Sequence, residues 1–385
     1  MHLPHLGAGH HAVGTGIGLQ LAELFIALVL GLAGTDLLPA PGGLQGTAGK
    51  QQRNKEGFRL HAADFTADAA VKWRIKPLLR STRKSAENPM SPFRSETLDL
   101  PDVRLHIRRW GRADAPTLFL LHGWMDVSAS FQFLIDELQR DWNIIAPDWR
   151  GFGPSQWLGR PYYFAEHIGD MEAILDHYAP EGQVRLVGHS MGGILSCLYA
   201  GIRPERVKSV VTLDGFGIAP TTPEMAPERY RAWLCQIRQP PRMHVYPDRQ
   251  GFAKRLMKTD RFLTAERADF LSRHLAIIGE GENKAGERRH GVVWNGDPWH
   301  KYFSPYLFRL EESEAIWRQI RCPVLWVAGR DSWVVRDFAT RPGDWERRQA
   351  CFAHLTETWI ENADHMLHHD QPADCARLIE EWFKV

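Results

Sequence analysis

Short apolar runs alternate with longer amphipathic segments from about residue 95 to the end of the chain. The apolar runs are rich in aliphatic and β-branched residues, which favour β-strands. They occupy residues 103–108, 117–121, 143–146, 184–187, 207–213, 324–328 and 358–360. Segments with the apolar spacing of helices follow several of these runs, at 131–140, 164–177, 191–201 and 373–383. This alternation predicts an α/β fold, with a mostly parallel sheet covered by helices on both faces.

The alternation stops in the middle of the chain. That stretch contains a cluster of prolines and no clear strand, and its apolar residues have helical spacing around 252–278. We therefore predict a helical cap, residues 218–317, inserted into a core made of residues 90–217 and 318–385. The aromatic residues of the cap either pack inside it or line an apolar cavity for a small substrate. They are Trp294, Trp299, Tyr302, Phe303, Tyr306 and Phe308.

Residues 1–89 differ in composition from the rest of the chain. They have no Lys or Arg before Lys50, one apolar run at 24–34, and an excess of basic residues over 50–84. The apolar run is too short to span a bilayer comfortably and lacks the basic residues that precede it in a signal peptide. We expect a poorly ordered extension and no stable membrane insertion. A natural translation start at Met90 is a second hypothesis for this region.

The charge and the cysteines of the chain restrict its partners and its compartment. The 385 residues include 47 Lys and Arg against 46 Asp and Glu, which gives a formal charge of +1. Such a balance provides no general field for nucleic acid, so we expect no nucleic-acid partner. The 5 cysteines are odd in number and lie far apart, without CxxC spacing. We therefore expect a reducing, cytoplasmic location and no metal site.

The strongest chemical signal is a serine in the sequence RLVGHSMGG, residues 185–193. An apolar strand precedes this GxSxG pattern and a helix-forming segment follows it, which is the context that a nucleophile elbow requires. A serine on such a strained turn exposes its hydroxyl above the sheet, and neighbouring side chains would crowd the backbone there. Gly188, Gly192 and Gly193 remove that crowding. The pattern therefore predicts Ser190 as a nucleophile.

A serine nucleophile needs a base and a carboxylate that orients the base. In this architecture the chain order is serine, then acid, then histidine. Asp331 follows the apolar run VLWVAG, and His365 follows the run TWIENA. We predict these two as the acid and the base, with Asp214 at the end of VVTLDG as the competing acid. His368 and His369, in the turn after the base, are expected at the helix entry or on the surface, without a metal.

The oxyanion hole is expected to come from two backbone amides. One is the amide of Met191, the residue after the nucleophile, and the other lies in the loop after the run TLFLL. By position that second donor is Trp124, whose indole is a candidate wall of the pocket. His122, in the same loop, is interpreted as a hydrogen-bonded scaffold residue.

Five motifs in order resemble those of the α/β-hydrolase superfamily. They are LLHGW, PDWRGFGPS, VGHSMGG, AGRDSWV and NADHMLHHDQP, and the resemblance spans about residues 95–385. Within the superfamily the chain is most similar to the serine-hydrolase-like proteins and related bacterial hydrolases. The resemblance implies an eight-stranded sheet, a helical cap after the sixth strand and hydrolysis without a cofactor. It also implies scaffold and turn roles for Asp148, Arg150, Gly151 and Gly153. Asp364 departs from the pattern, because relatives commonly have glycine before the histidine.

The identity of the nucleophile narrows the expected reaction. Haloalkane dehalogenases and epoxide hydrolases resemble this chain around HGW, but they use an aspartate where this chain has Ser190. A serine favours cleavage of an ester or related acyl bond of a small apolar substrate through an acyl-enzyme. Amide, thioester and carbon–carbon bond hydrolysis use the same triad and stay open. A ligand-binding or interaction module on a hydrolase fold is the alternative outside the enzymes.

Overall fold

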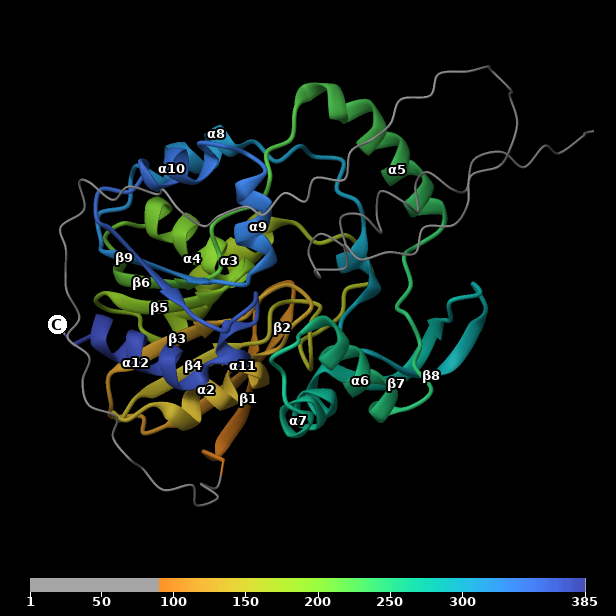
Figure 1. Ribbon diagram of the computed structural model, residues 1–385, viewed down its shortest axis with the longest axis horizontal. Helices are drawn as coiled ribbons and strands as arrows, with labels where there is room; N and C mark the ends of the chain where they lie inside the picture. Colours follow the sequence, from red (N-terminus) through yellow and green to blue (C-terminus); the bar gives the residue numbers. More distant parts are fainter. Residues whose placement is uncertain (1–89, 385) are drawn as a thin grey trace, which may run out of the picture. The chain divides into compact units, whose positions relative to one another are not determined.

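The computed structural model describes residues 90–384, and the predictions made for residues 1–89 lie outside the described residues. Within the described part, the main sheet has eight strands in the order β1-β2-β4-β3-β5-β6-β9-β10 (Figure 1). Their bounds are β1 Phe93–Asp99, β2 Arg104–Gly111, β3 Thr117–Leu121, β4 Asn143–Pro147, β5 Val184–His189, β6 Val207–Leu213, β9 Val324–Gly329 and β10 Leu355–Ile360. Strands β1, β2 and β4 pair antiparallel, and the pairs from β4 to β10 are parallel. The predicted α/β fold with a mostly parallel sheet is confirmed.

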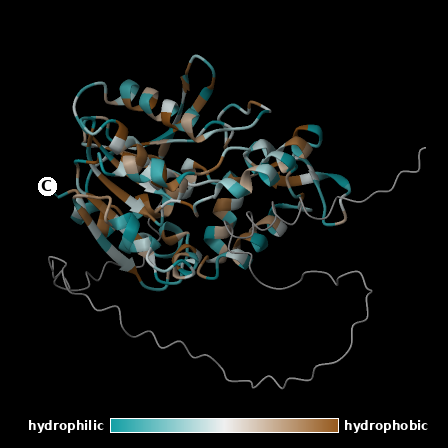
Figure 2. Cartoon of the chain, turned by 90° about the horizontal axis from the view of Figure 1, so that it is seen from above, coloured by the Kyte–Doolittle hydropathy of each residue, from teal (hydrophilic) through white to brown (hydrophobic). Residues whose placement is uncertain are grey.

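Helices cover both faces of this sheet, because the side chains of its central strands are apolar on both sides. One face packs against α2 (Gln132–Glu137) and α12 (Pro372–Trp382) through a cluster that includes Leu134 and Ile379. The other face packs against α3 (Phe164–Tyr178) and α4 (Met191–Ile202). Figure 2 shows the hydrophobic colour along the strands between these helices. No helix within residues 90–384 is both long and apolar enough to cross a membrane.

The segment after β6 forms the cap, and it is not purely helical. Its helices are α5 (Ala226–Arg238), α6 (Arg249–Thr259) and α7 (Ala265–Leu275), and short 3-10 turns lie at Pro223–Met225 and Pro298–Lys301. An antiparallel hairpin of β7 (Ala276–Glu282) and β8 (Arg288–Trp294) comes directly after α7. The expectation of an insertion without strands is wrong here.

The hairpin escaped the sequence pattern because glycine occupies positions where a strand normally carries apolar side chains. A Cβ at Gly281 would lie 2.6 Å from the carbonyl oxygen of Met243, and one at Gly291 would lie 2.6 Å from that of Tyr246. The backbone of residues 243–246 therefore packs directly on the hairpin, which a larger residue would prevent.

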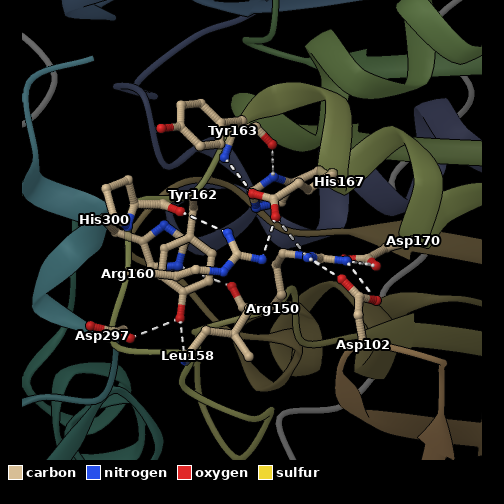
Figure 3. Close-up of polar contacts among 12 residues, drawn as sticks. Asp102, Arg150, Leu158, Arg160, Tyr162, Tyr163, His167, Asp170, Asp297 and His300 are labelled. Atoms are coloured by element: carbon tan, nitrogen blue, oxygen red, sulfur yellow. Dashed lines mark hydrogen bonds and ion pairs between the residues drawn. The ribbon is translucent and has the colours of Figure 1, made fainter. Parts of the chain in front are cut away.

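Ring stacking and hydrogen bonds at His300 and Asp297 attach the cap to the core. The imidazole of His300 stacks between the rings of Phe152 and Tyr162, with centroid distances of 3.7 and 4.0 Å. Its Nε2 donates to the carbonyl oxygen of Arg150 at 2.9 Å. The hydroxyl of Tyr162 donates to Asp297 at 2.8 Å (Figure 3). These contacts fix the end of the cap to the loop between β4 and α3.

The guanidinium of Arg150 organises that loop. It donates to both oxygens of Asp170 in α3, at 2.7 and 2.6 Å, and to Asp102 and Glu166 at 3.1 Å each (Figure 3). Arg150 is 3% exposed and Asp170 is 1% exposed. A planar guanidinium is suited to such a paired contact, which supports the predicted scaffold role of this residue.

Replacing Arg150 with Leu is expected to lower the free energy of unfolding by about 3–5 kcal/mol, because the buried carboxylate of Asp170 loses its counter-charge. The double variant Arg150→Leu with Asp170→Leu should recover much of this loss. Urea unfolding of the three proteins measures both effects. Arg160→Gln, which removes a more exposed contact to Glu166, serves as the control and should change stability by less than about 1 kcal/mol. A single variant as stable as the control would contradict this account.

Candidate active site

Ser190 stands at the sharp turn between β5 and α4. Its backbone has φ 50° and ψ −115°, a strained conformation for a residue with a side chain. The turn is possible because its neighbours are glycines. A Cβ at Gly188 would lie 2.3 Å from the backbone of Gly192, and a Cβ at Gly192 would lie 2.0 Å from the carbonyl oxygen of Leu121. The GxSxG pattern therefore has the strand–turn–helix geometry that the sequence predicts.

His365 bridges Ser190 and a buried aspartate. Its Nε2 lies 3.0 Å from Ser190 Oγ, and its Nδ1 lies 2.6 Å from Asp214 Oδ2. Asp214 follows β6, the strand next to β5, so its side chain starts close to the nucleophile turn. Its backbone has a φ of 53°, in the left-handed region where Asp is tolerated better than most residues.

Asp331, predicted as the acid, does not contact His365; the competing candidate, Asp214, does. The carboxylate of Asp331 pairs with Arg261 of the cap at 2.5 Å and is 37% exposed. Both aspartates end a parallel strand at the same edge of the sheet, so the sequence offered two candidates. The relative position of the strand ends decides between them, and chain order alone does not contain that information.

Asp214 is held in place by more than the histidine. Ser332 Oγ donates to Asp214 Oδ2 at 2.5 Å, and the backbone amide of Asp214 donates to Val327 at 2.8 Å. Burial raises the pKa of Asp214, while the hydrogen bonds from His365 and Ser332 oppose this effect. Ser332, next to the predicted acid, was missed at the sequence level. The sequence indicates this contact only through a serine that follows Asp331 and precedes α9 (Trp333–Ala339).

The two predicted oxyanion donors lie on the segments that meet at Ser190. Met191 is the first residue of α4, so its amide N–H has no acceptor within the helix. Trp124 follows Gly123, where a Cβ would lie 3.2 Å from Ser190 Cβ, so only glycine lets this loop approach the serine closely. His122 fixes the loop: its Nδ1 donates to Gly123 at 2.7 Å, and its Nε2 accepts from Trp149 at 2.9 Å.

A pocket of about 130 Å³ opens at Ser190 and His365. Most of its lining is apolar and comes from both the core and the cap. The main apolar residues are Trp124, Leu256, Leu271, Leu275, Trp294 and Trp333. Of the six cap aromatics proposed for such a cavity, Trp294 is in the lining.

Comparison with known proteins places this geometry in a family. The family model described as the alpha/beta hydrolase fold matches residues 116–372. The chain belongs to the α/β-hydrolase family. It is 24% identical to a serine hydrolase-like protein of Danio rerio over 322 residues, 80% of this chain and 94% of that protein. It is 30% identical to a serine hydrolase-like protein of Homo sapiens over 132 residues, 34% of this chain and 64% of that protein.

The solved structures agree on the fold. A thioesterase domain from the curacin biosynthetic pathway aligns with a TM-score of 0.65 and 21% identity, and the alignment covers 75% of this chain and 99% of that domain. At this identity the match supports the α/β-hydrolase fold alone.

Two histidines of this α/β-hydrolase, predicted at a helix entry or on the surface, lie in a short helix and are buried. His368 and His369 are 0% and 2% exposed, so the expectation of surface residues is wrong. They belong to α11 (Leu367–Asp370), which contacts the 3-10 turn at Ser128–Phe131, and their rings lie against those of Phe131 and Phe133. Two polar residues in succession gave no sequence signal for burial.

Asp364, the departure from the family pattern, binds backbone groups. Its Oδ1 accepts from the amide of His365 at 2.8 Å and from that of Trp333 at 3.1 Å. Its own amide donates to Asp370 at 2.8 Å. The charged side chain therefore holds the backbone of the base loop in place.

Asp370 also forms a carboxyl pair with Asp260, the residue that ends α6 of the cap. Burial and the neighbouring Asp260 raise the pKa of Asp370 to about 9. Burial raises the pKa of Asp260 as well. Two carboxyl groups at such close range resist ionising together, which favours one proton held by the pair. The pair links the cap to the loop of His365.

The carboxyl pair predicts that the free energy of unfolding falls as the pH rises towards about 9. Between the ordinary pKa of Asp370 in the unfolded chain and its raised pKa in the folded chain, the folded chain binds more protons than the unfolded one. The stabilisation is therefore complete at low pH and disappears as the pH rises to the folded pKa. In Asp260→Asn the amide donates to Asp370 without a shared proton, and the slope of stability against pH should become shallower. Urea unfolding at several pH values measures it. Asp269→Asn, on the exposed face of α7, should keep the wild-type slope, and equal slopes in all three proteins would refute the shared proton.

Proposed function

We propose that this α/β-hydrolase is a serine hydrolase that cleaves an ester or related acyl bond of a small apolar substrate. Ser190 acts as the nucleophile, His365 as the base and Asp214 as the acid that orients it. The observation that carries the proposal is the unbroken line of contacts from Ser190 Oγ to His365 Nε2 and from His365 Nδ1 to Asp214 Oδ2. A line of this kind is recognised by geometry and by roles, in any chain order.

In the proposed reaction, Ser190 Oγ attacks the carbonyl carbon while His365 Nε2 takes its proton. The carboxylate of Asp214 stabilises the imidazolium that forms and keeps the ring in the required tautomer. The amides of Trp124 and Met191 donate to the oxyanion. His365 then protonates the leaving group, and water releases the acyl group from Ser190 by the same steps in reverse.

The pocket supports a short acyl group. A cavity of 150 Å³ in another protein accommodates benzene, so the volume of about 130 Å³ suits a group of roughly four to six carbon atoms. The tryptophan and leucine side chains in its wall favour an apolar group. Amide, thioester and carbon–carbon substrates have the same requirements at the serine, and a panel of substrates distinguishes them.

Ser190→Ala is expected to lower ester turnover by at least about 10⁴-fold, because only the oxyanion donors and substrate binding stay in place. Asp214→Asn should lower it by about 10⁴-fold, since His365 loses its orienting carboxylate. Asp331→Asn is the matched control, because this residue ends the next parallel strand and pairs with Arg261. Steady-state kinetics on a p-nitrophenyl ester measures all three. A larger loss in Asp331→Asn than in Asp214→Asn would contradict the assignment.

Two further measurements test the enzyme class and the pocket. A fluorophosphonate probe should label the wild type and leave Ser190→Ala unlabelled, whereas a folded but unlabelled wild type would favour a ligand-binding module. Across p-nitrophenyl esters of increasing length, kcat/KM should peak at roughly four to six acyl carbons and then fall. A rise that continues to long acyl chains would contradict the proposed pocket size.

A further inference from the structure

Three buried side chains with metal-binding atoms converge beside the pocket. Asp126 follows β3, and His368 and His369 lie in α11. Their exposed fractions are 3%, 0% and 2%. One candidate ligand atom from each of the three lies within 4.8 Å of those of the other two. A tetrahedral zinc ion holds its ligand atoms about 3.3–3.6 Å apart, so a movement of roughly 1 Å would bring the three into coordination.

Each of the three residues has a buried polar atom without a partner among the described residues. These atoms are Asp126 Oδ1, His368 Nδ1 and His369 Nε2. Buried polar atoms are nearly always satisfied, because a buried donor or acceptor without a partner loses its hydration and gains nothing in return. Three such atoms on neighbouring buried residues favour a common partner, to which His368 also offers Nε2, 3.4 Å from Ser130 Oγ and 3.9 Å from Asp126 Oδ2.

The surrounding contacts orient the candidate ligands. The carbonyl oxygen of Ser130 accepts a hydrogen bond from the ring of His369, which leaves Nε2 as the nitrogen with a free lone pair. The hydroxyl of Ser130 donates to Asp126 Oδ2 at 2.7 Å and leaves Oδ1 available. A metal-binding histidine is commonly held in this way, with its second nitrogen on a backbone carbonyl.

We propose that Asp126, His368 and His369 bind a divalent transition-metal ion, and that zinc fits them best. Two imidazoles and one carboxylate form a donor set typical of zinc, whereas calcium and magnesium require mostly oxygen ligands. Asp126 and His369 line the pocket at Ser190, so the ion has an entry path from the substrate side.

Binding there would connect two loops of the proposed active site. Asp126 lies two residues after Trp124, and His368 lies three residues after His365. An ion between them would hold the loop of the oxyanion donor against the loop of the base. Arg267 contacts the backbone carbonyl of His369 and adds a positive charge nearby, which lowers the affinity that the donor set alone would provide.

The experiment is a zinc titration of the full chain after treatment with a chelator, followed by metal analysis and cobalt absorption spectroscopy. The wild type is expected to bind one equivalent of zinc, and cobalt at the same site should give the visible bands of a four-coordinate ion. His369→Gln and Asp126→Asn should each weaken binding at least about tenfold. His290→Gln, an exposed histidine of β8, is the matched control and should bind like the wild type.

The outcomes separate this site from the proposed hydrolase function. Ser190→Ala should bind zinc like the wild type, because Ser190 is not a ligand. Circular dichroism checks that each variant is folded. If a histidine variant fails this check, Asp126→Asn, which is nearly isosteric with the wild type, tests the site. Equal zinc binding by the wild type, His369→Gln and Asp126→Asn would overturn the proposal, as would binding that His290→Gln abolishes.

Discussion

The turn at Ser190 depends on how closely α4 approaches the strands on either side of β5. Gly192 lies against the carbonyl of Leu121 in β3, and a Cβ at Gly193 would lie 2.2 Å from the hydroxyl oxygen of Thr212 in β6. A larger residue at Gly192 would meet the backbone of β3, and one at Gly193 would meet the side chain of Thr212. The left-handed backbone of Ser190 is thus a consequence of packing, and the same packing brings the ends of β3, β5 and β6 together at one point.

The local features of the fold were predictable because their causes are local. The strand runs, the GxSxG turn and the break in the pattern that predicted the cap each depend on residues that are neighbours in the chain. The partner of His365 was not predictable to the same degree. Asp214 and Asp331 both follow a parallel strand, and only the distance between strand ends in three dimensions distinguishes them. The same limit applies to His368 and His369, whose burial depends on a helix that packs under Phe131 and Phe133.

Because Asp214 contacts His365, Asp331 forms a different contact. Asp331 pairs with Arg261, which directly follows the carboxyl pair residue Asp260 in the cap. The cap therefore touches the core at two adjacent positions, one an ion pair and the other a pair of carboxyl groups. Both contacts involve loops that follow β9 or β10, and both lie near the base. The loops after β9 and β10 thus connect the position of the cap to the position of His365.

Buried histidines form a second set of contacts with the segment of His365. His189, the residue before the nucleophile, lies 2.8 Å through its Nε2 from the backbone carbonyl of His365. Its ring is 4.4 Å from that of His368, which is 4.1 Å from that of His369. Burial lowers the pKa of all three rings, so near neutral pH they are uncharged groups with one donor and one acceptor each. Within the described residues, the carboxylate of Asp214 is the only buried carboxylate in hydrogen-bond contact with the ring of His365, and the neighbouring imidazoles are uncharged. The ring of His365 thus has a carboxylate at Nδ1 and the uncharged ring of His189 close by, and this difference follows from the burial of these side chains.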